Sequence, residues 1–266
     1  MNSALCERLG IEFPLFAFSH CRDVVVEVSK AGGFGVFGAA SMSAERLEEE
    51  LAWIDANIDG KPYGLDLLIP DKVMGKGESF DGERLLKAIP DSHIDFSARV
   101  LSEHGIESSD LERARRNTLQ IGKNLHPSGA EATMEVAFRH PIKLIANALG
   151  VPPDSMLEYG RKHGVAVAAL VGAKAHAIRQ LEAGVDILVV AGGEAGGHCG
   201  EVSTMVLVPE VVEAIQAYGD IPVLAAGGIV TGRQMAACMA MGAAGAWPAS
   251  VWLTTPEAET NPIVKE

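Results

Sequence analysis

The stretch EAGGHCGE, Glu194 to Glu201, holds the side chains best suited to chemistry. It directly follows an apolar run, 185–190, and places His198 and Cys199 between glycines. A histidine with a pKa near neutrality can take a proton from a carbon acid, and glycines let backbone approach a ligand closely. A structural histidine in a plain turn is the alternative. Cys199 has no recognisable base beside it, so we interpret it as a small spacer.

A second glycine-rich stretch, AAGGIVTGR, places Gly227 and Gly228 between an apolar run and a helix expected to start near Thr231. Backbone N–H groups there can approach an anion at the helix N-terminus. The next apolar run leads into Ala249 and Ser250, which are small enough to allow the same approach. Either loop alone is equally consistent with a turn or a helix cap. If the two loops are neighbours in a barrel, they predict a phosphate site.

These loops must be positioned by the alternation of short apolar runs with longer amphipathic ones. The runs are nearly continuous, as in parallel strands covered on both faces. Strand followed by helix, repeated about eight times, predicts an α/β fold, a (β/α)8 TIM barrel; a doubly wound open sheet is the competitor. The expected strands are Phe13–Phe18, Gly35–Phe37, Tyr63–Ile69, Ile142–Ala146, Val165–Leu170, Ile187–Val190, Val223–Ala226 and Gly245–Trp247, and the expected helices are Asp23–Lys30, Ala44–Asn57, Asp154–His163, Ala173–Ala183, Pro209–Ala217 and Thr231–Met241.

Two segments depart from the regular repeat. Residues 71–140 are too long for one crossover helix between the third and fourth strands. We expect a helical insertion there, either a lid or a solvated helix pair. Only a short tail follows the eighth strand, so we expect the chain to lack the covering C-terminal helix, through truncation or reliance on a partner. Residues 1–266 otherwise form a single domain.

Composition excludes several classes of protein. With 22 basic and 35 acidic residues, the net charge of −13 argues against a nucleic-acid partner. Four cysteines without CxxC spacing predict neither a metal site nor a disulfide framework, and favour a reducing cytoplasmic location. No secretory signal is expected, and the apolar stretch 234–256 is interrupted by glycine and proline, so no membrane segment is expected. The absence of GxGxxG after a strand argues against a Rossmann site.

The chain resembles the nitronate monooxygenase family, formerly called 2-nitropropane dioxygenase, along nearly its whole length. EAGGH followed by AAGGI is the most specific part of the likeness. The other stretches that carry it are SKAGGFGVFGA (29–39), LVPEVVEAI (207–215), the segment around AAGGI (221–243) and SVWLTTPEAE (250–259).

The resemblance implies a TIM barrel that holds FMN at the C-terminal ends of its strands. His198 matches the position of the family's catalytic base. The family's pattern has Gln at the position of Ala191 and Gly at that of Ala249, and both differences are expected to weaken FMN binding. The cofactor-binding positions implied by the likeness are Ala17, Phe18, Asp66 (a position that is often Asn), Ala191, Gly196, Gly197, Gly227, Gly228, Ala249 and Ser250.

The implied activity is oxidation of alkyl nitronates or nitroalkanes by O2, giving a carbonyl compound and nitrite. The implied partners are a small-molecule substrate and O2, and homo-oligomerisation stays open. Two alternatives remain: an NAD(P)H-dependent reductase of a quinone or an enoyl thioester, and a degenerate barrel that binds FMN weakly.

Overall fold

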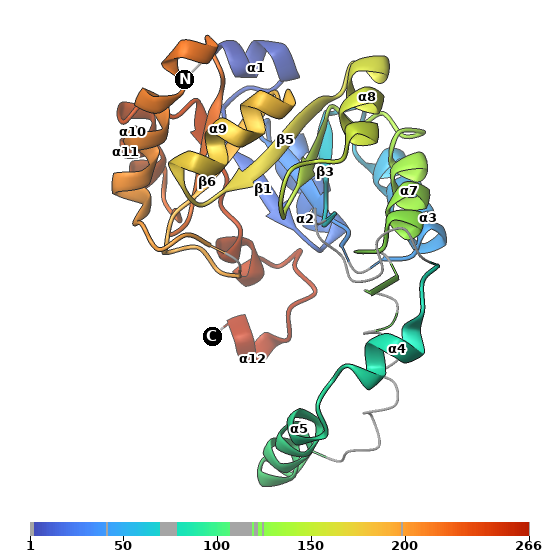
Figure 1. The fold of residues 1–266 in the computed structure, drawn as a ribbon. Coiled ribbons are helices and arrows are strands. Elements are labelled where there is room, and N and C mark those ends of the chain that lie inside the picture. Colours follow the sequence, from blue (N-terminus) through green and yellow to red (C-terminus); the bar gives the residue numbers. More distant parts are fainter. Residues whose placement is uncertain are drawn as a thin grey trace.

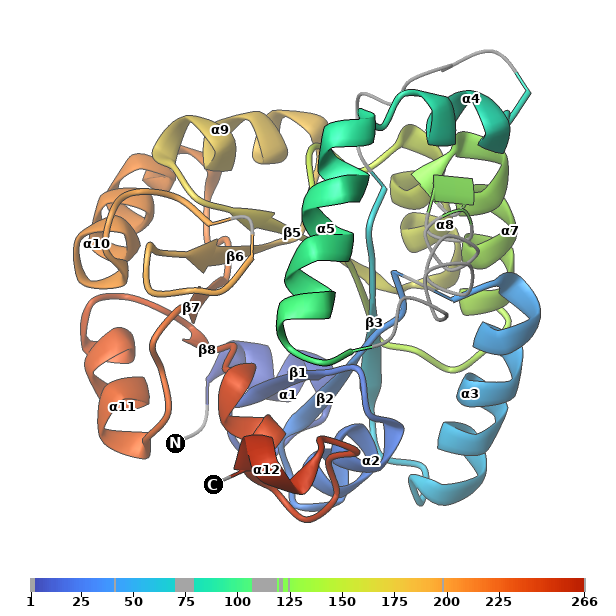
Figure 2. The ribbon, with the colours of Figure 1, turned by 90° about the horizontal axis from the view of Figure 1, so that it is seen from below.

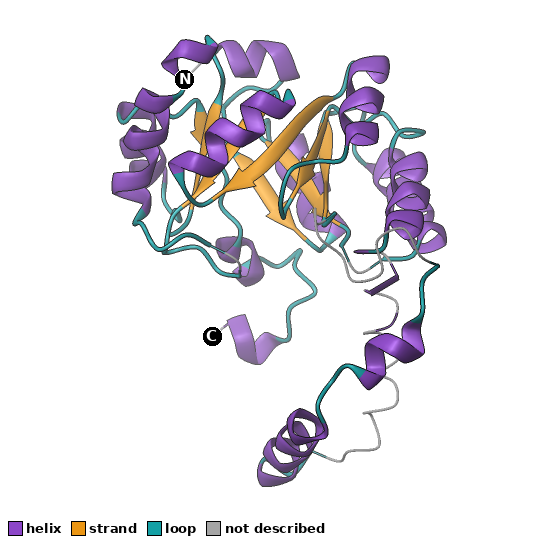
Figure 3. Ribbon diagram, in the orientation of Figure 1, coloured by secondary structure: helices purple, strands orange, loops and turns teal. Residues whose placement is uncertain are grey.

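Eight parallel strands form a barrel in which every strand pairs with the next along the chain (Figures 1 and 3). The structure is a computed structural model that describes residues 3–40, 42–69, 79–106, 119, 122–123, 125–197 and 199–265. A bridge between Leu15 and Ala246 joins the last strand to the start of the first, and so closes the barrel. The strands are β1 (Phe16–Ser19), β2 (Phe34–Gly38), β3 (Tyr63–Leu67), β4 (Leu144–Asn147), β5 (Ala166–Val171), β6 (Ile187–Ala191), β7 (Val223–Ala226) and β8 (Gly245–Ala246).

The closed sheet confirms the TIM-barrel prediction and excludes the open doubly wound sheet. Each expected strand is present, with ends shifted by up to three residues. The helices lie outside the barrel. They are α1 (Ala4–Leu9), α2 (Arg22–Lys30), α3 (Ala44–Asn57), α4 (Gly82–Lys87), α5 (Asp91–Glu103), α7 (Pro127–Ala137), α8 (Asp154–His163), α9 (Lys174–Ala183), α10 (Thr204–Ala214), α11 (Gly232–Ala240) and α12 (Pro262–Lys265), with the 3-10 turns η2 (Gln216–Tyr218) and η3 (Ser250–Thr254).

Side chains alternate between the barrel interior and the layer beneath the helices. In β3, Leu65 and Leu67 belong to the outer core, whereas Asp66 points inward. The interior cluster joins side chains such as Phe16 and Phe34 with Leu5 and other apolar residues of α1. Helix α1 therefore closes the end of the barrel where the strands begin, and ligands can reach the opposite end, which Figure 2 views.

The predicted helix Pro209–Ala217 was misplaced: α10 begins five residues earlier, at Thr204, and ends at Ala214. Proline often marks the first turn of a helix, but here Pro209 lies inside it. Its missing N–H leaves the carbonyl of Met205 without the usual helical donor. The start of this helix is instead held by a side chain from another loop, described below.

The insertion between β3 and β4 has two different parts. Helix α7 packs on α3 and buries Ala130, Met134 and Ala137, so it covers the barrel like an ordinary barrel helix. Helices α4 and α5 bury no residue and extend away from the barrel beyond the strand ends (Figure 1). Within the part of the chain that the structure describes, no helix is long and apolar enough to cross a membrane.

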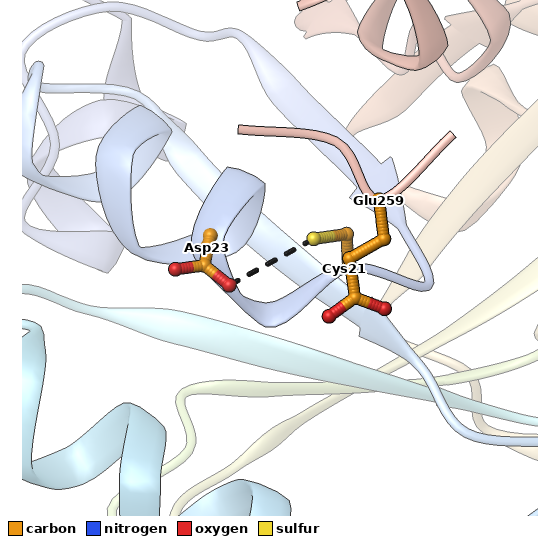
Figure 4. A group of neighbouring side chains, drawn as sticks. All are labelled: Cys21, Asp23 and Glu259. Carbon is orange, nitrogen blue, oxygen red and sulfur yellow. Dashed lines mark hydrogen bonds between the residues drawn. The ribbon is translucent and has the colours of Figure 1, made fainter. Parts of the chain in front are cut away.

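After β8 the chain forms η3, which packs against β1, and then α12. The segment between these two turns is tied to the start of α2, because the thiol of Cys21 donates a hydrogen bond to the carbonyl of Glu257 at 3.1 Å. Asp23 and Glu259 approach the same thiol, and the three potential ligand atoms lie within 4.8 Å of one another (Figure 4). Scattered cysteine spacing gave no hint of this cluster.

Candidate active site

A cavity of about 300 Å³ opens at the C-terminal ends of the strands. Glycine and alanine dominate the rim on the side of β6, β7 and β8, while Phe18, Leu170 and Trp247 supply apolar walls. Eight of the eleven residues singled out in the sequence line it, namely Phe18, Asp66, Ala191, Gly196, Gly227, Gly228, Ala249 and Ser250.

The other three predicted residues are placed differently. Ala17 is fully buried and does not line the cavity, because its neighbours Phe16 and Phe18 take the inward positions of β1. Gly197 is also absent from the lining. His198 lies outside the described residues, between Gly197 and Cys199.

Aromatic rings form the side of the cavity next to β1 and β8. Trp247 is buried, and its ring stacks on Phe16 and Phe18 at centroid distances of 6.0 and 6.5 Å. Its backbone N–H donates to the carbonyl of Ala225 at 2.7 Å. These contacts fix a rigid apolar wall, which suits a planar ring system.

Residues 227–229 and 249–251, on the β7 and β8 loops, line the same cavity. Within the described residues none of their six backbone N–H groups donates a hydrogen bond. Gly227 and Gly228 have φ angles of 98° and 69°, a left-handed conformation that glycine adopts without strain. Successive N–H groups in such turns make anion-binding concavities. Ala249 has φ of −126°, so its position needs no glycine.

The helix after β7 begins with a capping box. The Thr231 hydroxyl accepts from the Gln234 N–H, and the Gln234 side chain accepts from the N–H groups of Val230 and Thr231. Gly232 and Arg233, the first two residues of α11, do not line the cavity. The undonated N–H groups of the described cavity lining are therefore those of the two loops and not those of the helix.

Glu194 connects the loop after β6 to the loop after β7. Its carboxylate accepts hydrogen bonds from the N–H and the hydroxyl of Thr204, both at 2.8 Å. These bonds lower the pKa of Glu194. The Thr204 oxygen also lies 3.1 Å from the carbonyl oxygens of Ala226 and Gly227. Glu194 therefore caps α10 and secures the strand end that carries the free N–H groups.

The loop that carries His198 is fixed at both ends. The Gly193 N–H donates to the Val202 carbonyl at 2.8 Å and closes the base of the loop. A Cβ on Gly200 would overlap the carbonyl oxygen of Gly172, so the two backbones touch where β5 ends. By contrast, a Cβ on Gly196 would meet nothing within 4 Å. The tip between these fixed ends leaves space beside the cavity.

The described side chains that line the cavity include acidic residues and no basic ones. Asp66 and Glu194 are the ionisable side chains of its described lining, which includes no Lys, Arg or His. Burial raises the pKa of Asp66 well above its usual range. A second cavity of about 320 Å³ shares Ala148, Leu170 and Ala191 with the first and extends toward α9. Cys199 lines this second cavity rather than the first.

Sequence reasoning missed Thr204 and Trp247. Thr204 lies at the start of a helix that was expected to begin later, so nothing marked it as the link between two glycine-rich loops. The glycines at 192 and 227 were the available signal, because each leaves room for Thr204. A Cβ on Gly192 would overlap Thr204, and a Cβ on Gly227 would lie 2.8 Å from the Thr204 hydroxyl oxygen. Trp247 was expected to end the eighth strand, but its inward orientation follows only from closure of the barrel.

Residues 2–266 match the model of the family described as nitronate monooxygenase. The chain belongs to the nitronate monooxygenase family. The match confirms the resemblance seen in EAGGH and AAGGI and identifies the protein as an oxidoreductase of a flavin-dependent family.

Two relatives illustrate the range of similarity within the family. A protein of Mycobacterium tuberculosis, provisionally named a monooxygenase, is 50% identical over all of this chain and 70% of its own length. A Staphylococcus haemolyticus protein, named a probable nitronate monooxygenase, is 25% identical over all of this chain and 71% of its own length.

Solved structures share the fold. Nitroalkane oxidase from Streptomyces ansochromogenes superposes with a TM-score of 0.76 at 23% identity, over 99% of this chain and 72% of that one. FabK from Thermotoga maritima superposes with a TM-score of 0.71 at 22% identity, over 100% and 67% of the two chains.

Proposed function

We propose that the cavity binds FMN and that the protein oxidises alkyl nitronates or nitroalkanes with O2 to a carbonyl compound and nitrite. The observation that carries the proposal is a cavity with aromatic and glycine walls, lined by two loops in which six successive or neighbouring backbone N–H groups donate no hydrogen bond within the described residues. A phosphate group and a planar ring are the ligand parts that such surroundings suit.

Backbone N–H groups would be the donors to the phosphate, because the described lining offers no basic side chain and the Glu194 carboxylate is committed to Thr204. Such groups can neutralise part of a dianion. The loops of β7 and β8, with Gly227, Gly228, Ala249 and Ser250, would hold this end of FMN. Phe18, Ala191 and Gly196 would lie against the remainder, where the open space beside Gly196 leaves room.

We assign the role of base to His198, with the reaction occurring beside the flavin. Its imidazole would take the proton from the α-carbon of a neutral nitroalkane. The loop that carries His198 begins and ends at described contacts, Gly193 with Val202 and Gly200 with Gly172. Bound flavin supplies the redox chemistry by accepting electrons from the substrate and passing them to O2.

The first test is the absorbance spectrum of the purified protein, reconstituted with FMN if necessary. A flavin band at close to one per chain, followed by nitrite release from a nitronate in air, is expected. A chain that binds no flavin would instead be the degenerate barrel. Rapid bleaching of the flavin by NADH or NADPH without oxygen, with no nitronate turnover, would identify a reductase.

His198→Asn tests the base. Turnover of neutral nitroalkane should fall by about two to four orders of magnitude, the usual contribution of a general base. Turnover of preformed nitronate should persist, because its proton has already gone. Equal losses on both substrates would remove His198 from this role. Cys199→Ser, one residue along the same loop, is the matched control and should leave both rates near those of the parent protein.

A further inference from the structure

We propose that Asp66 is a neutral carboxylic acid in the resting protein and donates its O–H to the ring end of the bound flavin. The proposal rests on the proposed FMN site and adds that the Asp66 carboxyl group is protonated there. The resemblance placed Asp66 at a position that is often Asn. A protonated carboxyl group, like an amide, offers one donor and one acceptor.

Asp66 lies where an ionised carboxylate is hardest to sustain. Its side chain is only 3% exposed and points into the barrel from the end of β3. Within the described residues it forms no ion pair and accepts no side-chain hydrogen bond, and no basic residue lines the cavity. An isolated carboxylate in such surroundings keeps its proton rather than its charge.

The elements packed against Asp66 offer no compensating cation. In register with it lie Gly38 on β2 and Ala146 on β4, neither of which is charged. His20 reaches over Gly38 from the loop after β1, and its Nδ1 lies 2.8 Å from the carbonyl oxygen of Gly38. Glu194, the other ionisable group of the described lining, is committed to Thr204; His198 lies outside the described residues.

Barrel topology indicates which part of the flavin Asp66 meets. The strands follow the order β1 to β8 around the barrel, so β3 lies opposite β7. The free N–H groups that suit phosphate are on the β7 and β8 loops, and Asp66 therefore faces the far end of the ligand. A phosphate adds almost two negative charges to a cavity whose described lining holds no basic residue, which disfavours a further negative charge on Asp66.

This arrangement links FMN affinity to one proton. Deprotonation of Asp66 removes the O–H that donates to the flavin and leaves a carboxylate that receives no hydrogen bond from the described residues. FMN binding therefore weakens. The dissociation constant should be constant at low pH. Above the pKa of Asp66 in the free protein it should rise by about tenfold per pH unit.

The test measures the FMN dissociation constant against pH by flavin fluorescence, for the parent protein and for Asp66→Asn. The parent should lose affinity as the pH rises through the raised pKa of Asp66, and Asp66→Asn should bind with an almost flat profile. Asp220→Asn, which changes an exposed aspartate away from the cavity, should keep the parent profile. An unchanged slope in Asp66→Asn would overturn the proposal and assign the dependence to a histidine.

Infrared difference spectra of the flavin-free proteins give a second, independent result. Subtraction of the Asp66→Asn spectrum from that of the parent at pH 7 should leave the carbonyl band of a protonated acid. A carboxylate band would overturn the proposal even if FMN binds. Failure of both proteins to bind FMN at any pH would overturn the proposed FMN site and the hydrogen bond with it, whereas the carbonyl band would still show the neutral acid.

Discussion

The carboxylate of Glu194 receives both hydrogen-bond donors of Thr204, the backbone N–H and the hydroxyl, each at 2.8 Å. This pair joins the two stretches, EAGGH and AAGG, whose order along the chain characterises the family. Glu194 belongs to the first stretch, and the Thr204 oxygen lies 3.1 Å from the carbonyl oxygens of Ala226 and Gly227, the two middle residues of the second. Thr204 is thus a positioning residue for the proposed phosphate loop.

Thr204→Val tests this link with little change in side-chain volume. Loss of the hydroxyl removes one hydrogen bond to the exposed Glu194 carboxylate, where water can replace part of it, and we expect a decrease of about 0.5–1.5 kcal/mol in the free energy of unfolding. The β7 loop should also lose its support, so FMN should bind more weakly. Urea denaturation and flavin titration measure the two effects. Thr260→Val, away from the cavity, should change neither quantity; an unaltered FMN affinity in Thr204→Val would separate Thr204 from the site.

The same pair predicts a pH dependence of stability. The folded protein holds the pKa of Glu194 below its ordinary value of 4.5, so the unfolded chain binds this proton more tightly. The stability contributed by Glu194 is therefore complete above that value and is lost as the pH falls through the folded-state pKa. Glu194→Gln should be less stable than the parent at neutral pH, and the difference should shrink below about pH 4. A difference that stays constant would contradict the assignment. Thermal unfolding at a series of pH values measures it.

How much of this site the sequence could predict depends on the range of the interactions. Apolar runs and glycine stops predicted the barrel, because each strand and helix carries its own periodicity. Loops at the strand ends were also found, since glycine composition is local. Thr204, by contrast, acts through Glu194 ten residues away and through the end of another strand, and no local pattern records such a contact.

The error at Pro209 has the same origin. A proline is a common first residue of a helix, and it outweighed Ser203, a residue type that also favours the N-cap and directly precedes the observed start. The actual start depends on the Glu194 carboxylate, which arrives through the tertiary fold. Asp66 shows a further limit: its position in β3 was predictable, but its lack of a cation follows only from the residues that surround the cavity.

Gly227→Ala tests whether close packing, and not only backbone conformation, requires glycine in the β7 loop. Alanine at a φ of 98° costs about 1–2 kcal/mol, and its Cβ would also lie 2.8 Å from the Thr204 hydroxyl oxygen. Gly184→Ala is the matched control, since Gly184 has the same φ of 98° and its added Cβ would meet only the end of the Arg161 side chain, at 3.9 Å. Gly227→Ala should therefore be the less stable variant by denaturation and should bind less FMN. Equal losses of stability in the two variants would mean that backbone conformation alone requires glycine at position 227.

Gly196→Ala examines the proposed position of the cofactor without disturbing the protein. An added Cβ meets no atom within 4 Å, and the backbone at Gly196 is not left-handed, so the free energy of unfolding should stay within about 0.5 kcal/mol of the parent value. The methyl group would project beside the cavity that Gly196 lines. If flavin lies against this glycine, the FMN dissociation constant should rise at least several-fold. Gly232→Ala is equally unhindered but lies outside the cavity lining, and it should bind FMN like the parent. Unchanged affinity in Gly196→Ala would mean that the flavin does not rest on this loop, whereas weaker binding at unchanged stability requires a ligand in contact with Gly196.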